Sequence, residues 1–194
     1  MKVLVYDVET TGIPNWSAPS EDPSQPRITQ ICAELFDDAT LKTHSYIDCL
    51  IYPDGWTVPP EIEIMTGIST ARCQAGGATM HNVLPLFIDL WQRCDVRVAH
   101  NESFDMRMIR IELKRHSMFR DLVISDAPFA DHWKAGNAYC TLKEARKIIG
   151  GKMPKLGEAY QALIGQAMGE AHNAAVDVMA CKAVYFAIKA LAPT

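Results

Sequence analysis

Residues 3–12 read VLVYDVETTG, an apolar, β-branched and aromatic run that ends in two carboxylates and a glycine. Such a run is typical of a strand buried on both faces, where no water solvates a charge. Because side chains alternate along a strand, Asp7 and Glu9 point to the same face, roughly 7 Å apart. Carboxylate oxygens suit Mg²⁺ or Mn²⁺, so the segment indicates a metal site. A solvated acidic turn is the alternative.

A further carboxylate, Asp105, lies where an expected strand over 96–99 gives way to an expected helix over 104–116. The helix dipole favours an anion in this first turn, so Asp105 is either a helix-start residue or another metal ligand. Nearby, Asn101 is interpreted as satisfying loop backbone, and Phe104 as either a core residue or a residue that stacks on a base.

A third cluster holds His172 and Asp177, at the start of an expected helix over 173–191. Five residues on one helix are about 140° apart, so a shared site requires His172 on the preceding loop, with Asn173 capping the helix. Asp177 is surrounded in sequence by alanines and valines, and its buried carboxylate would require a cation. An ordinary core histidine is the alternative for His172.

Composition limits the class of protein. A chain of 194 residues fits one domain, so residues 1–194 are predicted to fold as a unit. Hydrophobic residues at 48% and charged residues at 22% exclude a disordered or collagen-like chain. The six cysteines form no Cys-x-x-Cys pair, which argues against a zinc ribbon. Without a signal-like start or a run of eighteen apolar residues, we expect a cytoplasmic protein with no membrane association.

The formal net charge of −4 would normally disfavour a polyanionic partner. Two bound divalent cations would cancel this charge. The composition therefore leaves nucleic acid open as a substrate, although a strongly basic groove binder would have a positive total.

The remaining pattern predicts a mixed α/β fold, in which strands come first and helices dominate later. Strands are expected over 28–36 and 43–52, and helices near 60–67, 83–91, 141–149 and 155–164. Thr141 and Glu144 have the spacing of a capping box at the start of one of these helices.

Two further features have open interpretations. The segment from Pro14 to Pro26 is too proline-rich for a helix or a strand, and its Trp16 either stacks on an unpaired base or anchors the loop to the core. On the helix over 104–116 a basic stripe is either a solvated face or a set of phosphate contacts. This basic stripe consists of Arg107, Arg110 and Lys114.

Together the three clusters resemble the DEDDh family of 3′ to 5′ exonucleases, the group that includes the proofreading epsilon subunit of bacterial DNA polymerase III. The three similar motifs are Asp7-x-Glu9-Thr10-Thr11-Gly12, His100-Asn101-x-x-Phe104-Asp105, and His172 with Asp177. Two departures stand out: Thr66 replaces a histidine often found before the glycine at position 67, and the proline-rich loop is longer than the usual connection.

The resemblance implies a ribonuclease H-like fold with a mixed five-stranded sheet flanked by helices. It also implies two divalent cations, Mg²⁺ or Mn²⁺, with His172 as the base that takes a proton from the attacking water. The implied metal ligands are Asp7, Glu9, Asp105 and Asp177. The implied substrate-binding residues are Thr10, Thr11, Ile13, Asn101 and Phe104.

The predicted function is therefore a 3′ to 5′ exonuclease that acts on single-stranded or frayed DNA with a free 3′ end and releases nucleoside 5′-monophosphates. RNA is the alternative substrate, because nothing in the motifs reads the 2′ hydroxyl. Two other classes stay open: a non-catalytic module that serves a DNA polymerase, and a phosphodiesterase for small nucleotides. The sequence does not define the pathway or the oligomeric state.

Overall fold

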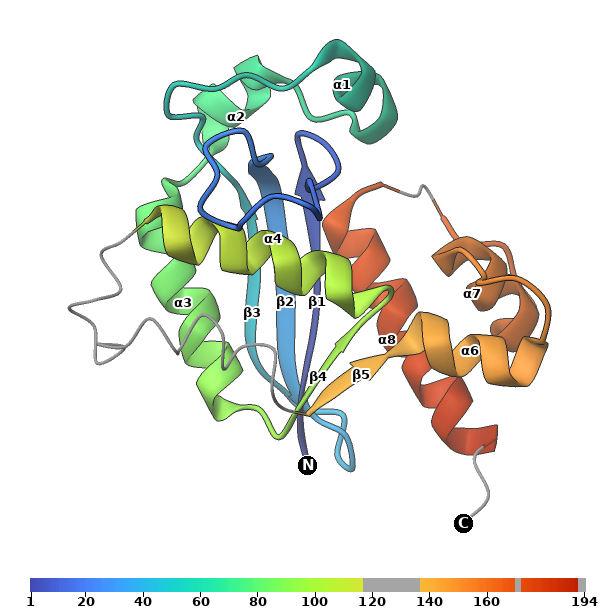
Figure 1. Cartoon of the computed structure of the whole chain (residues 1–194). Helices are drawn as coiled ribbons and strands as arrows, with labels where there is room; N and C mark the ends of the chain where they lie inside the picture. The colour runs from blue at the N-terminus through green and yellow to red at the C-terminus, as the bar shows by residue number, and fades with distance from the viewer. Residues whose placement is uncertain (117–136, 170–171, 192–194) are drawn as a thin grey trace.

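The computed structural model describes residues 1–116, 137–169 and 172–191. These residues contain a five-stranded sheet in the order β3-β2-β1-β4-β5, with helices on both faces (Figure 1). β1 pairs antiparallel with β2 and parallel with β4, while β2–β3 is antiparallel and β4–β5 is parallel. The predicted mixed sheet of five strands is confirmed.

The first three strands are long, and the last two, β4 and β5, are short. Their bounds are β1 (Lys2–Thr10), β2 (Ile28–Asp37), β3 (Thr43–Leu50), β4 (Val96–Ala99) and β5 (Ala138–Cys140). The helix bounds are α1 (Pro60–Thr66), α2 (Thr70–Gly76), α3 (Met80–Arg93), α4 (Glu102–Arg115), α6 (Thr141–Ile149), α7 (Leu156–Ile164) and α8 (Ala174–Leu191). Within the described ranges, none of these helices combines the length and the apolar character needed to cross a membrane.

The two faces of β1 pack against different helices. One set of alternate residues joins the main core with α3 and α4, and the other set, with Val3 and Val5, packs against α8. Asp7 and Glu9 follow Val3 and Val5 at the same period of two. The two carboxylates therefore emerge on the α8 face of the sheet, where the apolar row ends.

Three local features differ from the sequence expectations. Neither α2 nor β5 was expected from the pattern, because seven and three residues are too few for a clear period. The predicted capping box is wrong. Helix α6 begins at Thr141 itself, and the Thr141 hydroxyl lies 3.0 Å from Nδ1 of His100 and 3.3 Å from the Ala99 carbonyl oxygen.

The proline-rich loop, residues 14–26, is held down by side-chain hydrogen bonds to its backbone. The Gln25 amide donates to the Asn15 carbonyl at 2.9 Å and accepts from the Asn15 amide at 3.0 Å. From α4, the Arg107 guanidinium donates to the Ala18 carbonyl at 2.6 Å. This residue of the basic stripe thus binds the loop and is neither a solvated side chain nor free to contact phosphate.

The segment that carries α1 and α2 is fixed to the end of β3. The Ala78 amide donates to the Leu50 carbonyl at 2.9 Å, and the Tyr52 amide donates to the Ala78 carbonyl at 2.8 Å. At the intervening Gly77, an added Cβ would meet the Cys73 carbonyl oxygen and would lie 2.5 Å from the Tyr52 nitrogen. The absence of a side chain therefore permits this close approach of two backbones.

We predict that Gly77→Ala lowers the free energy of unfolding by about 1 to 3 kcal/mol, because backbone atoms cannot yield to the new methyl group. Gly76→Ala is the matched control, since a Cβ at the adjacent glycine meets nothing within 4 Å. Urea denaturation followed by circular dichroism measures both variants. Equal stability of the two would contradict the close backbone packing at position 77.

Candidate metal centre

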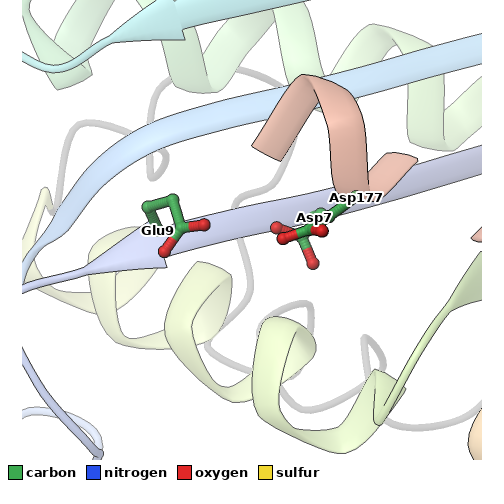
Figure 2. A group of neighbouring side chains, drawn as sticks. All are labelled: Asp7, Glu9 and Asp177. Carbon is green, nitrogen blue, oxygen red and sulfur yellow. The ribbon is translucent and has the colours of Figure 1, made fainter. Parts of the chain in front are cut away.

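Three of the predicted carboxylates meet at the end of β1. Asp7 and Glu9 project from β1, and Asp177 comes from the first turn of α8 (Figure 2). One oxygen from each of the three lies within 4.8 Å of the others. Oxygen ligands of Mg²⁺ lie at about 2.1 Å from the ion, so this spacing suits a shared divalent cation after a small closure.

Asp105 reaches the same region from the start of α4. Parallel pairing of β1 with β4 ends at Val5 and Val98, so the later part of β1 has no neighbouring strand on that side. In place of a strand, the Asp105 carboxylate accepts a hydrogen bond from the Val8 amide at 3.1 Å, and Asp105 is only 2% exposed. Asp105 thereby lies beside the cluster, but it does not belong to the group of three residues whose carboxylate oxygens lie within 4.8 Å of one another.

Burial and mutual repulsion make the carboxylates reluctant to ionise. Burial is the main cause that raises the pKa of Asp7, with Asp105 and Asp177 adding repulsion. For Glu9, burial and the charge of Asp177 raise the pKa to about 7. Burial also raises the pKa of Asp105 and of Asp177. A divalent cation would reverse this penalty, so the residues present fit a metal centre.

His172 lies on the loop that precedes α8, as the sequence predicts. Its backbone adopts a left-handed conformation with φ of 66°, and its amide donates to the Asp177 carboxylate at 3.2 Å. The Asn173 side chain accepts from the Ala175 amide at 3.1 Å, which confirms the predicted cap. The exposed His172 side chain lines the same pocket as the carboxylates.

This pocket has a volume of about 230 Å³ and brings together nearly all the predicted site residues. Its lining includes the expected set Asp7, Glu9, Thr10, Ile13, Asn101, Phe104, Asp105, His172 and Asp177. Thr11 is the exception. Its hydroxyl accepts from the Arg27 amide at 2.9 Å, which closes the connection between β1 and β2 and takes Thr11 out of the lining.

Five lining residues were not among the predicted site residues: Val8, Gly12, Ile62, Met65 and His100. Ile62 and Met65 come from α1. Residues three apart lie on the same side of a helix, and this spacing is the sequence signal that could have indicated a shared apolar surface. His100 has both ring nitrogens engaged, at 3.0 Å from the Thr141 hydroxyl and 3.0 Å from the Pro154 carbonyl oxygen. Burial lowers the pKa of His100, and its two engaged ring nitrogens fix the ring as part of the pocket wall.

A mixed sheet with carboxylates at the end of its central strand is the arrangement of metal-dependent nucleases with a ribonuclease H-like fold. The sequence pattern of the RNase_T family, described as exonuclease, matches residues 4–185. This match covers most of the chain, which therefore belongs to this exonuclease family. The predicted membership of an exonuclease family is confirmed.

Known relatives are longer than this chain. Three-prime repair exonuclease 1 of Bos taurus is 28% identical over an alignment 211 residues long, gaps included. The alignment covers 94% of this chain and 62% of that protein. A Mycobacterium tuberculosis (strain CDC 1551 / Oshkosh) protein named as a bifunctional exonuclease/endonuclease is 28% identical over 151 residues, covering 75% of this chain and 20% of that protein. The chain thus spans less than two thirds of either relative.

Solved structures of E. coli exonuclease I have the same fold. The complex with a dT13 oligonucleotide matches with a TM-score of 0.69 and 19% identity, over 97% of this chain and 40% of that chain. The zinc-ion-bound form of its complex with single-stranded DNA matches with a TM-score of 0.73 and 20% identity, over 99% and 41%. The predicted ribonuclease H-like fold is confirmed by this likeness.

We predict that Glu9→Gln stabilises the metal-free protein at pH 8 by about 2 to 4 kcal/mol. The pKa of Glu9 is raised from 4.5 to about 7, so the folded state holds an extra proton between these values. The free energy of unfolding therefore falls as pH rises through this window, and an amide removes that loss. Urea denaturation with a chelator at pH 4 and pH 8 measures the difference, which should vanish at pH 4.

Glu34→Gln is the matched control for this experiment. Glu34 and Glu9 are each 8% exposed, but Glu34 accepts hydrogen bonds from Lys182 at 2.7 Å and from Thr43 at 2.5 Å. Removing the Glu34 charge should destabilise the protein, because Lys182 loses its partner. If Glu9→Gln is also destabilising at pH 8, the charge of Glu9 does not lower the stability of the metal-free protein.

Proposed function

We propose that residues 1–194 form one exonuclease domain that removes nucleotides from the 3′ end of single-stranded or frayed DNA. Two divalent cations, Mg²⁺ or Mn²⁺, would assist hydrolysis and nucleoside 5′-monophosphates would be released. The observation that carries the proposal is the meeting of Asp7, Glu9, Asp105, Asp177 and His172 in one pocket. Family membership over residues 4–185 supports the reaction class.

In this proposal the four carboxylates hold the cations. Divalent cations supply Lewis acidity, which lowers the pKa of water and offsets the charge that develops on the phosphate. Asp7, Glu9 and Asp177 already share one small volume, and the bond from the Val8 amide orients Asp105 toward it. A ring nitrogen of His172, at the exposed edge of the pocket, would accept the proton of the attacking water.

Apolar side chains around the carboxylates would hold the terminal nucleotide. Ile13 is 81% exposed on the β1–β2 loop, and Met65 is 48% exposed on α1, so both are available to a base. Phe104 supplies an aromatic surface from α4.

RNA is the second candidate substrate, since discrimination against it needs a contact to the 2′ hydroxyl. The similar exonuclease I structures are complexes with a dT13 oligonucleotide and with single-stranded DNA, which supports DNA here. A DNA polymerase partner and a cytoplasmic location are further parts of the proposal. The six cysteines are all free thiols, in agreement with a reducing compartment.

We predict that purified protein trims a 5′-labelled single strand from its 3′ end only when Mg²⁺ or Mn²⁺ is present, and that Asp7→Asn slows trimming about a thousandfold or more. Gel analysis of matched DNA and RNA strands measures rate and preference. Asp89→Asn is the control, because Asp89 forms an exposed salt bridge with Arg93 on α3. Trimming that survives Asp7→Asn would place the chemistry elsewhere, and no trimming would favour a binding module.

We predict that His172→Ala lowers kcat by about a hundredfold to ten-thousandfold while the affinity for metal stays close to that of the wild type. The imidazole moves a proton in this proposal and holds no metal, so added imidazole should restore part of the rate. Steady-state kinetics and calorimetry of Mn²⁺ binding separate the two effects. His44→Ala changes another exposed histidine, on β3, as the control. Loss of metal affinity in His172→Ala would instead make His172 a ligand.

A further inference from the structure

Trp16 lies in the proline-rich loop, three residues after the pocket-lining Ile13, and is 57% exposed. The Arg107 guanidinium lies 5.8 Å from the centroid of its ring. A tryptophan that anchors a loop would be largely buried, because burial of its apolar surface supplies the stabilisation. Trp16 does not follow that pattern.

Other residues hold this loop in place. Gln25, only 3% exposed, bonds the backbone of Asn15 and Pro19, and Arg107 bonds the backbone of Ala18. From the far end of α4, Lys114 forms an ion pair with a carboxylate of the loop. The loop is therefore fixed without help from the indole, and an exposed aromatic ring is presented in a defined position.

Trp16 and Arg107 each follow a pocket-lining residue by three positions in the chain. Ile13, which lines the pocket, is three residues before Trp16 in the same loop. Phe104, which also lines the pocket, is one helical turn before Arg107 on α4, about 4.5 Å along the helix axis. Two segments of the chain thus lead from the pocket to the Trp16–Arg107 pair.

We propose that Trp16, supported by Arg107, is a stacking platform for a base on the 5′ side of the terminal nucleotide. This proposal rests on the proposed function and specifies its substrate as an unpaired strand longer than one nucleotide. Base–aromatic stacking tolerates every base, because each base has a π face. A paired base would hide that face, so the platform favours single strands.

Binding to a labelled single-stranded DNA 12-mer tests the platform in the Asp7→Asn background, which prevents trimming. Adding Trp16→Ala should weaken binding by about 5- to 150-fold, the range expected for one stacked base. Trp16→Phe should retain most of the affinity but lose the fluorescence quenching that the strand causes. Leu86→Ala, which removes a 56% exposed side chain from α3, should bind as the parent does. Equal binding by the alanine variant and its parent would overturn the proposal.

Kinetics separate stacking from a structural role. With Asp7 intact, Trp16→Ala should raise KM for the 12-mer more than KM for the p-nitrophenyl ester of thymidine 5′-monophosphate, which has no further base. An equal loss on both substrates would mean that Trp16 only supports the loop, and would overturn the platform. If the wild type trims no strand, the proposed function fails, whereas the binding comparison and the quenching still decide the role of Trp16.

Discussion

The structure depends on an unfavourable element: a central strand that carries carboxylates into the interior. β1 lies in the middle of the sheet with helices packed against both faces, and near its end Asp7 is half-buried and Glu9 is buried. Charge placed there raises the pKa of each acidic group and reduces the stability of the metal-free protein. The same burial strengthens attraction to a cation, since little water screens it. The fold thus gives up stability for affinity toward metal.

The geometry of the centre follows from strand lengths. β1 continues beyond Val5, where its pairing with β4 ends, and the freed edge of β1 leaves room for α4 to begin. Asp105 then bonds the Val8 amide that a longer β4 would have used. On the other face, the apolar row of β1 gives way to Asp7 where α8 begins. A short neighbour strand and a helix start therefore bring four carboxylates from three elements to one place.

The sequence was informative where local rules set the outcome. Alternation along a strand placed Asp7 and Glu9 on one face, and the cap at Asn173 placed His172 before α8. It was less informative where tertiary partners compete for a group. Thr141 has the form of a cap residue, but the half-buried His100 takes its hydroxyl. Arg107 has the form of a surface residue on the basic stripe, yet the proline-rich loop over α4 buries it. Neither competitor is visible in local sequence.

The division between sheet and loops also separates chemistry from recognition. The carboxylates are fixed by β1, α4 and α8, which pack through the core and resist displacement. The surfaces available to a base, Ile13, Trp16 and Met65, lie on a loop and a short helix outside that core. Under the proposed function, changes in those segments would alter the preferred length of the nucleic acid or the preferred sugar while leaving the cation ligands in place. The segments between β1 and β2 and around α1 are also where the sequence departs from the usual family pattern.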